Sequence, residues 1–330
     1  YLRGEADFDT AAVHPAGFYD EHDIELRTST TVTSINPGAS TVDLDSGETL
    51  GYHRLLLTTG AQPRRLTVPG SDLPGVLYLR SVADSDHLRQ AVTANMPVVV
   101  IGAGWIGAEV AASARQLGAD VSLVEMAQVP LERVLGAEVG AVFRDLHADH
   151  GVHLHFGVGI ESIGGAGRVE EVRLTDGTVL PAGAVVAGVG VTPRAELAEA
   201  AGLQIDNGVV TDQHLATSLP GVYAAGDVAN VFYPSRGTRI RLEHWSAALN
   251  QGPVAARNML GEKEVYDKTP YFFSDQYDLG LEYRGWAPAY DQVVFRGDTA
   301  AREFIAFWLA GDRVLAGMNV NIWDQGDAID

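Results

Sequence analysis

Residues 102–107 read Gly-Ala-Gly-Trp-Ile-Gly, and the way this stretch is flanked decides the fold. It follows the apolar, β-branched run at 97–101 and precedes a small-residue helical pattern at 108–117. A strand, a glycine loop and a helix in this order are typical of the start of a dinucleotide-binding βαβ unit. The stretch therefore predicts an α/β fold with a nucleotide at the loop.

The glycines of this loop meet three different physical demands. Gly102 permits a tight turn out of the strand, Gly104 lets the backbone approach a pyrophosphate, and Gly107 lets the helix pack closely on the strand. The helix N-terminus then presents N–H groups and the positive end of its dipole to phosphate oxygens. We expect Gly102, Gly104, Ile106 and Gly107 to bind the cofactor; the alternative is a turn without a ligand.

A second strand is expected at 120–125, and its last residue is an acid, Glu125. Glu125 lies 18 residues after Gly107, close to the roughly 20 residues that precede a ribose-binding acid. Its carboxylate would accept a hydrogen bond from a ribose 2′-hydroxyl and repel a 2′-phosphate, which predicts NAD rather than NADP. Arg133 either softens that preference or is a solvated surface charge.

Composition excludes several classes of function. A chain of 330 residues with 46% apolar content has material for two or three domains. The 23 basic against 43 acidic residues leave a net charge of −20, which disfavours nucleic acid and anionic membrane as partners. No apolar run reaches the ~18 residues of a membrane-spanning helix. Because the sequence has no cysteine, it holds no disulfide, thiolate zinc site, iron–sulfur cluster or cysteine nucleophile.

Apolar periodicity and turn residues place the other elements. The tail from Thr269 is aromatic-rich and alternating, which predicts an antiparallel sheet in its own domain. The remaining expectations are β structure at 21–60 with a buried strand at 54–58, helices at 137–150 and 246–260, a hairpin at 169–180 that turns at Asp176-Gly177, and strands at 152–155, 184–189 and 222–225.

Several motifs taken together resemble one family. They are Leu-Leu-Thr-Thr-Gly-Ala-Gln-Pro-Arg at 56–64, the glycine loop, Gly-Val-Gly-Val-Thr-Pro at 188–193, and Leu-Pro-Gly-Val-Tyr-Ala-Ala-Gly-Asp at 219–227. The sequence resembles the FAD-dependent NADH:ferredoxin reductases, the flavoprotein components of oxygenase and cytochrome P450 electron-transfer chains. The resemblance continues through 273–277 and 321–324. It implies a glutathione-reductase-like fold of two dinucleotide-binding domains and an α+β C-terminal interface domain.

The resemblance also implies the domain boundaries. An FAD-binding domain would comprise residues 1–81 and 207–268, an NAD-binding Rossmann domain 82–206, and the interface domain 269–330. Members of the family open with their own strand–GxGxxG–helix unit for FAD, which this sequence lacks, and they continue beyond the position that matches Asp330. We therefore expect a fragment, a nicked chain or missing termini, with the first βαβ unit absent and the interface domain incomplete.

The matched motifs carry flavin contacts over to this sequence. Asp227 resembles the acid that binds the ribityl chain, Arg80 the arginine that reaches the FAD pyrophosphate, and Val32 a backbone contact at the adenine end. The alternatives are a turn-capping aspartate, a surface arginine and an ordinary strand valine. Three further residues in the same motifs are expected to bind the cofactors: Thr59, Gly60 and Gly226.

Three more residues resemble groups close to the reacting rings. Trp245 matches a position beside the isoalloxazine, Glu109 a glutamate near the nicotinamide, and Gly190 a close approach of the backbone to the NAD ribose. We expect Glu109 and Trp245 to be catalytic. The alternatives are a tryptophan in the core at a helix start and a solvent-exposed glutamate.

The resemblance implies hydride transfer from NADH C4 to flavin N5, followed by single-electron transfer to a [2Fe–2S] ferredoxin-type protein. Relatives that reduce disulfides need a redox cysteine, which this sequence lacks. The expected enzyme is therefore an NADH-dependent, cytoplasmic ferredoxin reductase with FAD and NAD as cofactors. An NADH oxidase or diaphorase, or a truncated NAD-binding relative without turnover, remains the alternative.

Two charged clusters need separate interpretations. Arg236, Arg239 and Arg241 lie just before Trp245 and either dock an acidic ferredoxin or form a solvated loop. Four histidines lie at 147, 150, 153 and 155. Because two of them are expected at a helix end, where an imidazolium suits dipole and solvent, we interpret them as a surface cluster and expect no metal site.

Overall fold

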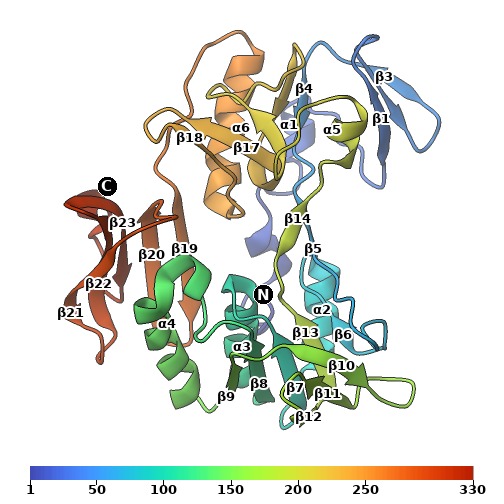
Figure 1. The fold of residues 1–330 in the computed structure, drawn as a ribbon. Coiled ribbons are helices and arrows are strands. Elements are labelled where there is room, and N and C mark those ends of the chain that lie inside the picture. The colour runs from blue at the N-terminus through green and yellow to red at the C-terminus, as the bar shows by residue number, and fades with distance from the viewer. Residues whose placement is uncertain (330) are drawn as a thin grey trace. The chain divides into compact units, whose positions relative to one another are not determined.

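The structure, a computed structural model, describes residues 1–329 of the chain, so the Asp330 end of the predicted interface domain lies outside it. The chain folds as a mixed α/β protein in two compact units (Figure 1). Unit 1 comprises Tyr1–Ala11, Pro63–Val191 and the chain from Phe273 onward. Unit 2 comprises Ala12–Gln62 and Thr192–Phe272.

A five-stranded parallel sheet forms the centre of unit 1. Val98 to Ile101 are all buried, because a parallel sheet covered on both faces needs continuous apolar strands. The strands predicted at 97–101 and 120–125 are confirmed to the residue. In spatial order the strands are β6 (Val76–Leu77), β13 (Ala184–Ala187), β7 (Pro97–Ile101), β8 (Asp120–Glu125) and β9 (His153–Phe156).

Three helices connect and cover this sheet: α2 (Val82–Ala91), α3 (Trp105–Gln116) and α4 (Glu132–Asp149). The buried face of α3 carries alanines, which let the helix lie close to β7 and β8. The backbone of α4 is interrupted at Gly136, where φ is 81°. Each helix thus begins just after a strand, as a Rossmann-type unit requires.

Two antiparallel sheets complete unit 1. The smaller one contains β10 (Ile160–Gly164), β11 (Glu171–Leu174) and β12 (Val179–Pro181), and the predicted turn at Asp176-Gly177 is confirmed. The larger one confirms the predicted C-terminal sheet, and α7 (Gly326–Ile329) follows it. Its strands in spatial order are β19 (Tyr271–Gln276), β20 (Leu279–Gly285), β23 (Arg313–Val320), β22 (Glu303–Ala310) and β21 (Gln292–Asp298) (Figure 1).

The C-terminal sheet and α4 are tied together inside unit 1. The indole N–H of Trp308, a fully buried side chain, donates to the carbonyl of Leu135 at 3.0 Å. Arg302 and Asp149 form an ion pair across the same two elements. The C-terminal sheet is therefore held against α4 within unit 1.

Unit 2 is built of small sheets and short helices. The β structure predicted at 21–60 is only partly confirmed, since 22–31 contains no strand and a short helix, α1 (Phe18–Glu21), precedes it. One sheet is the antiparallel β1 (Val32–Asn36), β2 (Thr41–Leu44) and β3 (Thr49–Gly51). The other elements are β4 (Leu55–Leu57) paired with β16 (Val222–Ala224), the sheet β15 (Val209–Thr211), β17 (Ala229–Tyr233) and β18 (Thr238–Ile240), and the helices α5 (Glu196–Ala200), η2 (Gly226–Val228) and α6 (Trp245–Met259).

The observed units cut the chain at other residues than the predicted domains. Residues 63–81 belong to unit 1, because β6 pairs in parallel with β13 of the nucleotide-binding sheet. The chain leaves and re-enters unit 1 within the paired strands β5 (Ala61–Pro63) and β14 (Val191–Pro193). A further 3-10 turn, η1 (Phe8–Ala11), ends the first segment of unit 1. The three-domain division stays a prediction.

None of the helices in the described part of the chain combines the length and the apolar character needed to cross a bilayer.

Candidate functional site

The glycine loop connects β7 to α3, and two of its glycines are required by close backbone contacts. A Cβ on Gly102 would lie 2.5 Å from the carbonyl oxygen of Gly188, and Gly102 itself has φ of 92°. A Cβ on Gly107 would lie 1.8 Å from the carbonyl oxygen of Gly102. Both separations are far below van der Waals contact, so the loop can close only with glycine at these positions.

Gly104 differs from its neighbours because the space beside it is open. A Cβ built there would meet no described atom within 4 Å, and its backbone is extended, with φ of −73°. Gly104 is the N-cap of α3, whose first N–H groups have no partner inside the helix. Ile106 is 41% exposed on the first turn. An open loop at a helix N-terminus fits the pyrophosphate of a dinucleotide.

Glu125 is fixed by the backbone on both of its oxygens. Oε2 accepts the N–H of Ala103 at 2.7 Å, and Oε1 accepts the N–H of Ala127 at 3.0 Å. A carboxylate offers about four acceptor positions, so two backbone bonds leave capacity for ribose hydroxyls. Arg133 is exposed on the first turn of α4. The predicted ribose contact therefore has a held carboxylate available, and its role stays a prediction.

Two further predicted positions lie in unit 1. Gly190 has φ of 90°, and its carbonyl accepts the N–H of Arg64 at 2.9 Å. Arg80 is exposed just before α2, and its backbone N–H donates to Asp84 at 3.1 Å. The left-handed backbone at Gly190 favours glycine, and the roles assigned to both residues stay predictions.

The flavin-binding candidates gather at one edge of a parallel strand pair in unit 2. β4 and β16 are paired so that Leu57 faces Ala224, and the N–H of Ala225 donates to the carbonyl of Leu57. Thr59 and Gly60 follow the first strand, and Gly226 and Asp227 follow the second. Carboxyl ends of parallel strands are where ligands bind in open α/β sheets.

The Gly226-Asp227 turn is held by one side chain of α6 and by Arg241, which precedes that helix. The side-chain oxygen of Gln251, which is 1% exposed, accepts the N–H of Gly226 at 2.8 Å. The buried guanidinium of Arg241 donates to the carbonyl of Asp227 at 3.1 Å. The turn therefore keeps its shape while Asp227 as a residue is only partly buried, which suits a ligand with several hydroxyls. Sequence reasoning did not identify Gln251.

Two other predicted positions in unit 2 are less constrained. Trp245 begins α6 and is 59% exposed, so the alternative of a tryptophan in the core is wrong. Its predicted contact with the flavin stays a prediction. Val32 begins β1 opposite Leu44 and is partly buried, which agrees equally with an ordinary strand residue.

Glu109 is partly buried and has a specific partner. The hydroxyl of Ser274, on β19, donates to its Oε1 at 2.7 Å. Burial raises the pKa of Glu109 above that of a free glutamate, the nearby charge of Asp275 raises it further, and the Ser274 bond opposes both. The alternative of a solvent-exposed glutamate is wrong. Sequence reasoning did not find Ser274 because it lies 165 residues away.

The predicted surface cluster of histidines is wrong for His147. That side chain is fully buried, and burial lowers its pKa to about 4, so it is neutral. His150 is partly buried against the ring of Tyr277, and only His153 is well exposed, bonded to Asp120 at 3.0 Å. In the described part of the chain, no group of three or more potential metal ligands is gathered in one place.

The predicted basic surface is also altered by the structure. The side chain of Arg241 is only 7% exposed and pairs with Glu243 at 2.5 Å. Arg239 donates to the carbonyls of Thr211 and Asn230. Arg241 is therefore removed from the predicted docking surface. Arg239 is exposed and Arg236 is partly exposed, so both stay candidate docking residues.

Comparison with known proteins gives one family over most of the chain. Residues 2–252 match the pyridine nucleotide-disulphide oxidoreductases, and residues 271–326 match a domain described as reductase C-terminal. The rhodocoxin reductase of Rhodococcus erythropolis is 38% identical over 322 residues, which span 97% of this chain and 75% of that protein. The ferredoxin–NAD⁺ reductase component of the anthranilate 1,2-dioxygenase system of Burkholderia cepacia is 41% identical, over 94% of this chain and 77% of that protein.

A solved structure is similar in fold over the whole chain. It is the crystal structure of a covalent complex of putidaredoxin reductase with putidaredoxin, with a TM-score of 0.95 and 37% identity. The match covers 100% of this chain and 80% of that one. The similarity extends through both units and through the C-terminal sheet.

Proposed function

The chain belongs to the pyridine nucleotide-disulphide oxidoreductase family, and we propose that within it the protein is an NADH-dependent ferredoxin reductase. FAD and NAD(H) are the cofactors of this family, and FAD supplies the chemistry that converts a hydride into single electrons. The matched relatives are covered over about three quarters of their length, including the C-terminal region.

The observation that carries the proposal is the arrangement around the glycine loop. Gly102 and Gly107 close the loop by contacts that no other residue permits, while Gly104 stays open. The loop N–H of Ala103 is held by Glu125, whose charge suits a 2′-hydroxyl and opposes a 2′-phosphate. The residues present therefore fit NADH as the electron donor.

The flavin would be held by unit 2. Asp227 would accept hydroxyl groups of the ribityl chain, and Gln251 and Arg241 keep the turn that carries it in place. Thr59 and Gly60 lie at the same strand edge. Trp245, exposed at the start of α6, would lie beside the isoalloxazine. Val32, on β1, would contact the adenine end of FAD. The predicted contact of Arg80 with the FAD pyrophosphate concerns a residue of unit 1.

Glu109 is the charged group proposed for the nicotinamide end. As hydride leaves NADH, the nicotinamide ring gains a positive charge, and a fixed carboxylate nearby stabilises that charge. Ser274 holds the carboxylate of Glu109 at 2.7 Å. Gly190, with its left-handed backbone, would let the NAD ribose approach closely.

The electron acceptor is a small iron–sulfur protein. The similar solved complex contains putidaredoxin bound to its reductase, and other relatives are named for ferredoxin. Arg236 and Arg239 would contribute to docking an acidic partner near Trp245 by charge complementarity. Because NADH is an intracellular reductant, we place the protein in the cytoplasm. Nucleic acid is not among its expected partners.

An acceptor assay tests this proposal against an NADH oxidase or diaphorase. The FAD-loaded protein is supplied with NADH and, in separate reactions, with a [2Fe–2S] ferredoxin, oxygen alone or a quinone. The proposal expects ferredoxin to be reduced much faster than oxygen or quinone. Faster turnover with oxygen or quinone would support the alternative, and NADH binding without any turnover would support a non-catalytic relative.

A further inference from the structure

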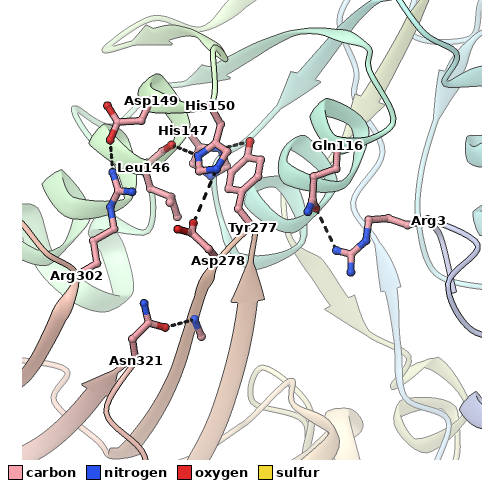
Figure 2. A network of polar contacts seen from close by, with 11 residues as sticks. Arg3, Gln116, Leu146, His147, Asp149, His150, Tyr277, Asp278, Arg302 and Asn321 are labelled. Atoms are coloured by element: carbon pink, nitrogen blue, oxygen red, sulfur yellow. Dashed lines mark hydrogen bonds and ion pairs between the residues drawn. The ribbon is translucent and has the colours of Figure 1, made fainter.

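A network of hydrogen-bonded polar side chains runs through unit 1 from the turn between β19 and β20 to Glu109. This polar network consists of Tyr277, His147, Gln276, Ser274 and Glu109. The hydroxyl of Tyr277 lies 3.3 Å from His147 Nδ1, and His147 Nε2 lies 3.1 Å from Gln276 Oε1. Gln276 Nε2 then lies 3.3 Å from Ser274 Oγ, which is bonded to Glu109. Figure 2 shows the outer end, where Tyr277 and His147 point toward each other.

The inner members of this polar network are almost completely removed from solvent. Ser274 is 2% exposed, Gln276 1% and His147 0%. Buried polar groups are costly unless each one is hydrogen-bonded, and a satisfied network fixes a single arrangement of its members. Ser274 and Gln276 alternate along β19 and therefore lie on one face of the strand. The polar network is therefore part of the packing of the β19–β20 hairpin.

The hydrogen-bond donors of the polar network all point in the direction of Glu109. Because His147 is neutral, it has a single N–H. Gln276 uses its amide N–H toward Ser274, so its oxygen accepts from His147 Nε2, and His147 Nδ1 accepts from the hydroxyl of Tyr277. Ser274 accepts from Gln276 and has its own proton left for Glu109. Each bond therefore strengthens the next toward the carboxylate.

Tyr277, at the outer end of the polar network, has an unusual backbone conformation. Tyr277 has φ of 58°, a left-handed value that is an outlier for a bulky residue. Its ring stacks on His150 with centroids 3.7 Å apart and planes 9° apart. Burial raises the pKa of the Tyr277 phenol, although Arg115 opposes this, so the phenol keeps the proton that it donates. Strain of this kind persists only where the surroundings fix the residue.

We propose that Ser274, Gln276 and His147 are positioning residues that hold the carboxylate of Glu109 in one orientation for hydride transfer from NADH. This inference rests on the proposed function of the protein, because it takes Glu109 to act at the nicotinamide. It adds that the C-terminal sheet takes part in the chemistry of the nucleotide-binding domain, through a path that touches no substrate.

The charged groups around Glu109 give the inference a measurable sign. Burial and Asp275, whose charge is partly offset by Arg3, favour the protonated form of Glu109. The hydrogen bond from Ser274 favours the ionised form. Toward the other end of the polar network, His147 lies near His150 and Gln276, and it stays neutral. Loss of the Ser274 donor therefore raises the pKa of Glu109.

The test measures that pKa directly, without turnover. Protein labelled with ¹³C at the glutamate side-chain carboxyl carbon is titrated by NMR, and Glu109→Gln identifies the signal. Ser274→Ala is expected to raise the pKa of Glu109 by about one unit, the equivalent of one hydrogen bond to a charged group. Ser274→Thr keeps the hydroxyl and should restore the pKa. Ser162→Ala, on β10, is the matched control and should leave it unchanged.

A second variant tests Gln276 and His147, the members of the polar network that do not contact Glu109. Gln276→Leu leaves the Ser274 hydroxyl in place but removes the donor that orients it, so a smaller shift in the same direction is expected. If Ser274→Ala leaves the pKa of Glu109 unchanged, the positioning role is overturned. If Ser274→Ala shifts it and Gln276→Leu does not, Ser274 acts alone and the role of Gln276 and His147 is overturned.

The same variants separate this inference from the proposed function. In stopped-flow reduction of the FAD-loaded protein by NADH, the acidic limb of the pH–rate profile should move with the NMR pKa, about one unit upward in Ser274→Ala. If the NMR pKa moves while the pH–rate profiles of the wild type and Ser274→Ala coincide, the link to hydride transfer is overturned. An unreactive wild type with a shifted pKa would instead contradict the proposed function.

Discussion

The carboxylate of Glu125 accepts a hydrogen bond from the backbone N–H of Ala103 at 2.7 Å. The acid at the end of β8 therefore holds the loop that follows β7, and under the proposed function the same side chain would also select the nucleotide. Its second oxygen is held by Ala127 at 3.0 Å. A charge fixed in this way would discriminate between a ribose hydroxyl and a 2′-phosphate without needing to reorient.

Glu125→Gln tests this discrimination. The amide keeps an acceptor for Ala103 but removes the negative charge that repels a 2′-phosphate. The preference for NADH over NADPH should fall by about tenfold, the value of one hydrogen bond to a charged group. Steady-state kcat/KM values with the two nucleotides give the ratio, and Glu161→Gln on β10 is the control. An unchanged ratio in Glu125→Gln would contradict the assignment.

Gly107→Ala and Gly104→Ala should separate folding from binding at the same loop. A Cβ on Gly107 would collide with the Gly102 carbonyl, whereas one on Gly104 enters open space. Gly107→Ala is expected to lower the free energy of unfolding by about 1–3 kcal/mol, as overpacking typically does. Gly104→Ala should leave stability nearly unchanged and weaken NADH binding.

Thermal unfolding and NADH titration measure the two effects. The account is contradicted if Gly104→Ala binds NADH as tightly as the wild type, since the open space would then not hold the pyrophosphate. Equal thermal stability of the wild type and Gly107→Ala would contradict the close contact with Gly102.

His147 makes the stability of the protein depend on acid. Its pKa is lowered from 6.5 to about 4 in the folded state, so the unfolded chain binds more protons between these values. Stability is therefore complete above pH 6.5 and falls as the pH drops toward 4, by about 3 kcal/mol in total. In His147→Gln this contribution should disappear.

Urea unfolding of both proteins at pH 7 and pH 4.5 gives the difference. Other titrating groups contribute equally to the two proteins, so the difference between them isolates His147. If the free energy of unfolding of His147→Gln falls as steeply with acid as that of the wild type, that result contradicts the assignment of His147 as a buried, neutral imidazole.

Asp227→Asn tests the flavin site in unit 2. The substitution keeps the shape of the turn held by Gln251 and Arg241 but removes the charge that would accept ribityl hydroxyls. The Kd for FAD, measured from flavin fluorescence during titration, should rise by about tenfold. Asp206→Asn, an exposed aspartate of the same unit, should leave it unchanged. Equal values for wild type and Asp227→Asn would contradict the assignment.

The nucleotide-binding part of the fold could be predicted because its signals are local. β7 and β8 are buried strands of a parallel sheet, so they are continuous apolar runs, and the glycines between them are spaced for one kind of loop. Helix α2 was missed because it is polar, with Leu88 as its main buried apolar residue. Its one clear local signal is the capping box of Ser81 and Asp84.

The part of the site that could not be predicted depends on contacts distant in sequence. His147 is buried by a hairpin that begins 124 residues later at Tyr271, and nothing near it in the sequence predicts this. Arg241 has the pattern of a surface arginine and is turned inward to the carbonyl of Asp227. Charged and polar residues have their environments decided by tertiary packing, which periodicity does not report.

Anaerobic stopped-flow mixing of the FAD-loaded protein with NADH, followed by a second mixing with oxidised [2Fe–2S] ferredoxin, tests the central claim most directly. The account predicts rapid loss of the flavin absorbance with NADH, much slower loss with NADPH, and reoxidation of the flavin with simultaneous reduction of two ferredoxins. A flavin that NADPH reduces faster than NADH, or that ferredoxin fails to reoxidise, would contradict it.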